Sequence, residues 1–136
     1  MTRARRKELV YYAHAMCMYG HPAEDLELDL IEQTFPACKI INPADYGSDP
    51  KKLADTLGFC FGLVDTVDRV VFSRLLGKVT AGVGAEINYA LGAKKAVYEL
   101  KGQGTSWKFL PVLKPVRYIS RAATRDLYRT FRMRDY

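Results

Sequence analysis

The sequence predicts an α/β fold, with three layers in a Rossmann-like or flavodoxin-like layout and a central sheet of four or five mostly parallel strands. Short apolar runs alternate along the chain with longer helical patterns, an order typical of a parallel sheet covered by helices. Right-handed crossovers between parallel strands leave few other layouts. A length of 136 residues with 49% hydrophobic residues suits one domain, 1–136, around a single core.

Each element follows from a local pattern. The predicted strands are short apolar runs, at 9–13, 38–42, 69–73 and 96–100, with a short fifth run at 109–113. Helical patterns occupy 23–35, 51–66 and 85–93, and Ser120 can cap a last, arginine-rich helix that runs to about Arg132. We therefore expect a core of about 9–100 and a C-terminal extension, 101–136.

The net charge of +6, from 21 basic and 15 acidic residues, is unevenly distributed. The segment 117–134 contains six arginines and one acid, and four of the arginines recur at every fourth position: Arg117, Arg121, Arg125 and Arg129. On a helix this spacing makes one stripe. A solvated face, or ion pairs with the acidic 24–32 helix of the same or a neighbouring subunit, is the favoured interpretation. Contact with phosphate or nucleic acid is the alternative.

Several classes of protein are disfavoured. No apolar run reaches the roughly 18 residues of a membrane span, and the basic stretch 1–7 is followed by too short an apolar run for a signal peptide. Three widely spaced cysteines, Cys17, Cys38 and Cys60, cannot form a closed disulfide framework, so we expect a reduced, cytoplasmic protein. The seven-residue spacing of His14 and His21 matches no standard metal site, and we expect no metal or cofactor.

In an open parallel sheet, ligands bind beyond the carboxyl ends of the strands. The predicted loops there are 14–22, 42–50 and 73–84. Candidate substrate-binding residues in or beside the first two are Tyr12, His14, Tyr19, His21, Asn42 and Asp45. The tyrosines can stack a base or belong to the core. The two Asx residues can reach a sugar or build turns, and His21 can act as a general acid or lie in a surface loop.

The segment from Thr80 to Asn88 gives the strongest indication of the chemistry of the site. Gly82 and Gly84 are expected in a turn that lets the backbone approach a ligand closely. Glu86 then falls in the first turn of a helix, where the helix dipole favours the ionised carboxylate. Such a carboxylate can act as a nucleophile or bind sugar hydroxyls. The alternative is an ordinary βα turn with an ordinary charge at the helix start.

This segment resembles the nucleoside 2-deoxyribosyltransferase superfamily, which includes the 2'-deoxynucleoside 5'-phosphate N-hydrolases. The resemblance rests on Gly82-Val83-Gly84-Ala85-Glu86-Ile87, on the strand Val70-Val71-Phe72 before it, and on the stretch from Ala90 to Val97 after it. The opening stretch from Tyr11 to Met16 also resembles the family's first motif. The resemblance covers roughly 9–100 and leaves the extension uncovered.

The resemblance implies an enzyme that breaks the N-glycosidic bond of a nucleoside or nucleotide, as a transferase or a hydrolase, with Glu86 as the nucleophile. It also implies a homo-oligomer, because relatives build their sites with residues from neighbouring subunits. The N-hydrolases have a sugar-binding acid eight positions before the Asp that opens the next strand; taking Asp68 as that Asp, the position holds Cys60, and Asp65 is the nearest substitute. Asp68 itself can orient substrate or simply end a helix.

The cysteine at position 60 favours a second class of function, a non-catalytic nucleotide-sensing or nucleic-acid-associated module on the same fold. The turn from Gly82 to Glu86 favours the enzyme.

Overall fold

The computed structural model describes residues 7–133 and contains a five-stranded sheet in the order β2-β1-β3-β4-β5. The strands are β1 (Glu8–Ala13), β2 (Cys38–Ile41), β3 (Arg69–Phe72), β4 (Ala96–Gln103) and β5 (Ser106–Pro111). The first four are parallel, and β5 is antiparallel to β4. The predicted mostly parallel α/β fold is thereby confirmed. The prediction that the basic stretch 1–7 is not part of a signal peptide concerns residues of which the structure describes only Lys7. Arg134, the last arginine of the basic segment 117–134, also lies outside the described residues.

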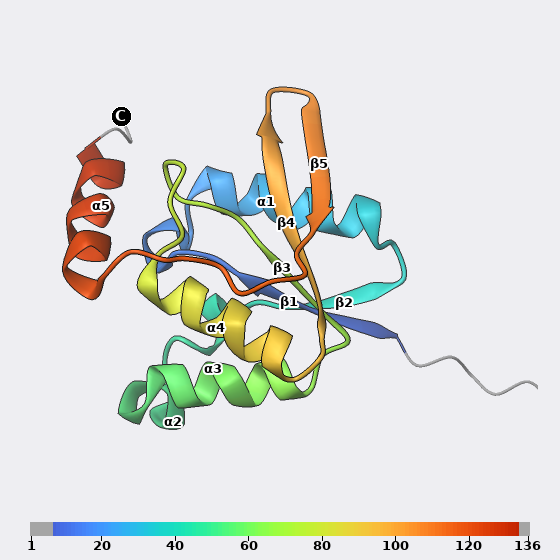
Figure 1. Ribbon diagram of the computed structural model, residues 1–136, viewed down its shortest axis with the longest axis horizontal. Coiled ribbons are helices and arrows are strands. Elements are labelled where there is room, and N and C mark those ends of the chain that lie inside the picture. The colour runs from blue at the N-terminus through green and yellow to red at the C-terminus, as the bar shows by residue number, and fades with distance from the viewer. Residues whose placement is uncertain (1–6, 134–136) are drawn as a thin grey trace, which may run out of the picture.

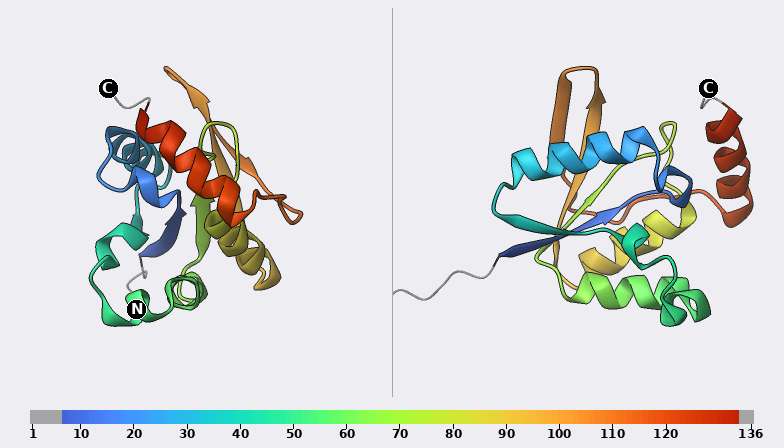
Figure 2. Two further views of the ribbon diagram at one scale, coloured as in Figure 1. Left: turned by 90° about the vertical axis from the view of Figure 1, so that its left-hand side faces the viewer. Right: turned by 180° about the vertical axis from the view of Figure 1, so that it is seen from behind.

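Helices cover both faces of this sheet (Figures 1 and 2). One face carries α1 (Pro22–Thr34), and the other carries α3 (Thr56–Asp65) and α4 (Ala81–Gly92), with the short α2 (Pro50–Ala54) preceding α3. Two 3-10 turns, η1 (Met16–Met18) and η2 (Pro43–Tyr46), follow β1 and β2. The last helix, α5 (Arg121–Met133), lies apart from these layers, beside η1.

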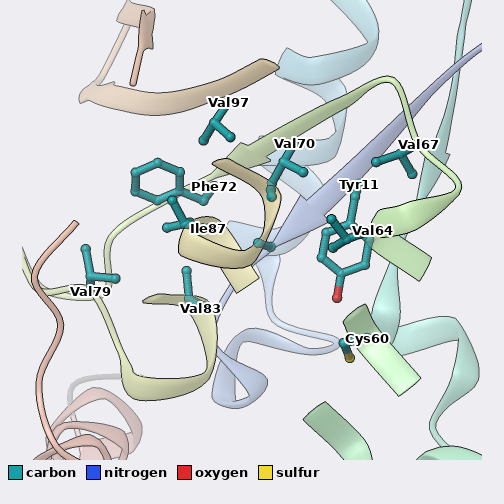
Figure 3. Packing of buried hydrophobic residues seen from close by; sticks show 12 residues of the cluster. Tyr11, Cys60, Val64, Val67, Val70, Phe72, Val79, Val83, Ile87 and Val97 are labelled. Carbon is teal, nitrogen blue, oxygen red and sulfur yellow. The ribbon is translucent and has the colours of Figure 1, made fainter. Parts of the chain in front are cut away.

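Alternation along the strands divides the core in two. Successive side chains of a strand point to opposite faces, so Tyr11, Val70 and Phe72 pack with α3 and α4 (Figure 3). Their neighbours Tyr12 and Val71 pack instead against Ile31 of α1 and the side chains of β5. The face on which a strand residue lies therefore decides which helices it meets.

Caps divide one predicted helix and fix the start of another. The helix predicted over 51–66 is divided at Asp55, whose carboxylate accepts the Gly58 N–H at 3.0 Å and starts α3 as a new helix. The first helix starts at Pro22 rather than Ala23. His21 is its N-cap, and Nδ1 accepts the Ala23 N–H at 2.9 Å.

The helix predicted to start at Ala85 starts at Ala81, so Gly82 and Gly84 lie in α4 and not in a turn. Glu86 consequently lies in the second turn of α4 and not in its first, as predicted. Gly84 is needed for packing, because a Cβ there would lie 2.3 Å from the Tyr118 ring. Gly82 has open space around its Cβ position. A contact 34 residues along the chain therefore explains one of the two glycines.

The fifth strand was predicted at 109–113 but spans Ser106–Pro111, where it forms a hairpin with β4 through a turn at Gly104. The sheet thus extends into the predicted C-terminal extension. Beyond the hairpin, residues 112–120 cross over α4 to α5 (Figure 1), and we call this segment the strap. Asn88 holds its middle by accepting the Val116 N–H at 2.8 Å and donating to the Val116 carbonyl at 3.1 Å. Ile119 N–H donates to the Val79 carbonyl at 3.0 Å.

Candidate functional site

A cavity of about 500 Å³ lies beyond the carboxyl ends of β1 and β3, where the sheet topology predicts a ligand site. It is bounded by the segment after β1, by α3, by the first turns of α4, by the strap and by α5. The residues that line it include His14, Tyr19, Cys60, Thr80, Gly82, Glu86, Tyr118, Arg121, Thr124, Arg125 and Tyr128. Of these, His14, Tyr19, Gly82 and Glu86 were predicted as site residues.

Glu86 is the buried carboxyl group of this cavity. It is 7% exposed, and the Tyr11 hydroxyl donates a hydrogen bond to its Oε2. Burial raises the pKa of Glu86 to about 7, although the Tyr11 hydrogen bond and the charge of Lys52 act in the opposite direction. Near neutral pH, the side chain therefore exists as a mixture of carboxylic acid and carboxylate.

Tyr11 reaches Glu86 because it lies on the sheet face that meets α3 and α4. Burial and the neighbouring Glu86 raise the pKa of this phenol far above its ordinary value, so it stays a hydrogen-bond donor. The Cys60 side chain lies near the hydroxyl end of Tyr11 (Figure 3). Burial and the Glu86 charge raise the pKa of its thiol, and a neutral thiol is a poor nucleophile.

Lys52 supplies a cation close to the cavity. It is 5% exposed, its Nζ donates to the Pro43 carbonyl at 2.6 Å, and the same atom lies 5.3 Å from the centroid of the Tyr19 ring. Lys52 was not predicted as a site residue, because a lysine in a helical pattern is ordinarily solvated. Tyr11 was missed as well, although alternation on β1 distinguishes its face from that of Tyr12.

Tyr12 does not line the cavity. It is fully buried on the α1 face, where its hydroxyl donates to Glu27, and Glu27 also accepts the Ser73 hydroxyl at 2.6 Å. Burial raises the pKa of Glu27, while these two hydrogen bonds lower it. The prediction that Tyr12 stacks a base is not supported by this position, because β1 directs its ring to the opposite layer.

His14 lies where this buried network meets the cavity. Its ring stacks on Tyr12 with the centroids 3.7 Å apart. Nδ1 lies 3.0 Å from the Tyr12 carbonyl, and Nε2 lies 2.6 Å from Oε2 of Glu24. Because a carbonyl only accepts, Nδ1 carries a hydrogen. Burial lowers the pKa of His14, although the hydrogen bond with Glu24 acts in the opposite direction.

Two predicted catalytic residues, Asp65 and Asp68, lie away from the cavity. They come just before β3, hence at the amino-terminal edge of the parallel strands, whereas the cavity is at the carboxyl edge. Asp68 accepts the Leu9 N–H at 2.8 Å, and Asp65 accepts the Tyr89 hydroxyl at 2.7 Å. Their positions do not support a role in orienting substrate.

The remaining predicted site residues have local structural positions. Asn42 caps η2 by accepting the Ala44 N–H at 3.0 Å, Asp45 lies within that turn, and His21 caps α1. None of the three lines the cavity. Gly84, under the Tyr118 ring, shapes the wall rather than touching the hollow.

The arginines do not form one continuous stripe. Arg117 lies in the strap, before the helix, while Arg121 and Arg125 line the cavity. Arg129 is 3.6 Å from Asp126 in an exposed pair. Within residues 7–133, no arginine of the strap or α5 is paired with a carboxylate of α1, so the expected ion pairs within one subunit are not formed.

Within the same residues, no three His, Cys, Asp or Glu side chains gather as a metal site would require. No helix among them is long and apolar enough to span a bilayer. The geometry thus offers one buried carboxyl group in a hollow lined by tyrosines and arginines. Comparison with protein-family models, curated proteins and solved structures finds no match to this chain.

Proposed function

We propose that this protein cleaves the N-glycosidic bond of a nucleoside or nucleotide, as a hydrolase or a transferase, with Glu86 as the nucleophile. The supporting observation is the placement of Glu86, a buried carboxyl group in a cavity at the carboxyl edge of the sheet, hydrogen-bonded by Tyr11. The resemblance of the segment from Gly82 to Ile87 points to the same residue. A buried carboxylate facing a hollow can stabilise an oxocarbenium-like transition state.

The chemistry follows the logic of a retaining glycosidase. A carboxylate oxygen of Glu86 attacks the anomeric carbon, and the C–N bond breaks with its electron pair leaving on the base. The base takes up a proton as it leaves. Tyr19, which lines the cavity and carries a hydroxyl proton, is the candidate donor. Water or the N–H nitrogen of a second base then attacks the same carbon, gives its proton to Tyr19, and releases Glu86 as the carboxylate.

The test is release of free base, followed by chromatography, from a panel of ribo- and deoxyribonucleosides and their 5'-monophosphates. We expect base release from at least one of them, and its loss in Glu86→Gln. Asp65→Asn is a matched control, because it makes the same chemical change outside the cavity. Base release that persists in Glu86→Gln contradicts the mechanism, and no release or exchange with any substrate contradicts the enzyme.

A second candidate is a non-catalytic nucleotide-binding module, favoured by Cys60. This residue lines the cavity where the resemblance implies a sugar-binding acid. The two candidates differ in one measurement: the module binds nucleotides without releasing base. Nucleic acid as the partner has less support, because the arginine stripe is divided between the strap, the cavity and solvent.

The proposal includes a homo-oligomer. Residues 56–64 of α3 carry no charged side chain, although Leu57, Phe59, Phe61 and Leu63 are only partly buried in one subunit. A helix that is apolar on most sides is ordinarily covered. Light scattering coupled to size-exclusion chromatography tests this directly, and a monomer at micromolar concentration contradicts it.

A further inference from the structure

Two of the α5 arginines face the cavity without a counter-ion. Arg121 and Arg125 lie four residues apart, hence on one face of α5, and both line the cavity. Neither forms an ion pair with any of residues 7–133. Like charges at this spacing destabilise a helix. Two unpaired positive charges on one face of a helix that lines a cavity indicate that the cavity binds an anion.

The same part of the cavity offers hydrogen-bond donors with no acceptor. The N–H groups of Gly82 and Val83, in the first turn of α4, have no acceptor among the described residues. Ala81 N–H is different, since it donates to Thr124 Oγ1 at 3.0 Å. The free end of a helix attracts anions through its unpaired N–H groups and its dipole.

Thr80 is the independent sign of a missing ligand. It is the N-cap of α4, where a threonine hydroxyl ordinarily bonds to the first turn, but it makes no such cap. Its side chain is 2% exposed and lines the cavity. The Tyr128 hydroxyl is a neighbour of its Oγ1, but no described residue forms a hydrogen bond of acceptable geometry with that oxygen. A buried hydroxyl without a partner destabilises the fold, and a ligand oxygen would remove that cost.

We propose that Arg121, Arg125, Thr80 and the first turn of α4 bind a phosphate group of the substrate. The enzyme proposed above then acts on a nucleotide rather than on an uncharged nucleoside, and the inference rests on that proposed function. The phosphate lies at the amino end of α4, and the sugar extends along the helix toward Glu86, one turn further on. Both arginines belong to the C-terminal extension, outside the stretch that carries the family resemblance.

The strap gives these arginines a fixed place. Asn88 binds Val116 in both directions, and the Tyr118 ring lies over Gly84. Met16 N–H donates to the Tyr128 hydroxyl at 3.2 Å on the far side of Arg125 along α5. The helix is thus tied to α4 at its start and to η1 further along. A preorganised pair of guanidinium groups can grip phosphate oxygens in a forked geometry.

The test measures binding without turnover, by calorimetry on the full chain in a Glu86→Gln background. The probes are the four deoxynucleoside 5'-monophosphates, the matching nucleosides and inorganic phosphate. We expect monophosphates to bind more tightly than nucleosides, and Arg121→Gln or Arg125→Gln to weaken monophosphate binding by about tenfold each. Arg129→Gln, with the same charge change one turn further along, leaves binding unchanged.

Three results overturn the inference: equal affinity for nucleosides and monophosphates, equal weakening by Arg129→Gln, or nucleoside binding that weakens as much as monophosphate binding. The thermal unfolding midpoint of each variant shows whether it folds, and Arg125→Lys, which keeps the charge, should recover part of the affinity. The two proposals fail separately. Base release from nucleosides alone contradicts this inference and keeps the enzyme, whereas arginine-dependent phosphate binding without base release keeps the site and contradicts the enzyme.

Discussion

Glu86 is a carboxyl group held where its ionised form is costly. Its pKa is about 7 in the folded chain, against an ordinary value of 4.5. The folded state therefore retains a proton between these values that the unfolded chain releases, and stability falls as pH rises from about 4.5 through about 7. Such a cost at one buried side chain is typical of a site selected for chemistry rather than for stability.

Replacing Glu86 with Gln should remove that cost. We expect the variant to be more stable than the wild type at pH 8 by about 3 kcal/mol, and little different from it near pH 4.5. Urea unfolding at the two pH values measures the difference. Asp29→Asn, at an exposed position of α1, is the control and should change stability little at either pH. A Glu86→Gln variant that is less stable at pH 8 would show that the carboxylate is stabilised rather than strained.

The pH dependence of the proposed activity follows from the same group. Only the carboxylate can attack, so kcat/KM for base release should rise with pH and level off above a midpoint near 7. Tyr11→Phe removes the hydrogen bond that favours the ionised form, so the midpoint should move to higher pH. A profile measured on both proteins tests this, and a midpoint that stays in place or moves down would separate Tyr11 from the titration of Glu86.

Among the elements, α4 shows how a local pattern can mislead. Two glycines within three residues predict a turn, because each weakens a helix by about 1 kcal/mol relative to Ala. The helix nevertheless includes both. Gly84 is explained by Tyr118, which packs where a Cβ would lie, and no window of neighbouring sequence contains that contact. The strands were easier to predict, since alternation and apolar runs are local signals of burial.

The two glycines provide a matched pair of substitutions. Gly84→Ala places a methyl group against the Tyr118 ring, and we expect it to destabilise the protein by about 1–3 kcal/mol, the usual range for overpacking. Gly82→Ala meets open space and should stabilise the helix by up to about 1 kcal/mol. Thermal unfolding of both variants tests the pair. Equal changes in the unfolding midpoint of the two variants would contradict the close packing of Tyr118 on Gly84.

At the scale of the molecule, the sheet positions Glu86 and the C-terminal extension completes its cavity. Residue types and strand order were enough to predict the carboxyl edge and to single out Glu86, His14, Tyr19 and Gly82. They could not predict that residues 112–120, which are distant from α4 in sequence, return to cover it. For the same reason Asp65 and Asp68, which are close to a strand in sequence, lie at the wrong edge, while Arg121 and Arg125 lie at the cavity.

Because the sheet and the strap contribute separately to the cavity, we expect that the strap can become more mobile without unfolding of the sheet. Asn88→Ala removes both hydrogen bonds to Val116 and leaves that backbone N–H without its acceptor. We expect faster amide hydrogen exchange across the strap and the start of α5, with β1 and β3 unchanged. Nucleotide affinity should fall at the same time, because Arg121 and Arg125 lose their fixed place.

Thr130→Val, on an exposed part of α5, is the control and should alter neither amide exchange nor nucleotide affinity. Exchange that rises equally in the sheet would mean that the strap holds the whole domain together, and unchanged affinity with a loosened strap would mean that the arginines act without being held in place.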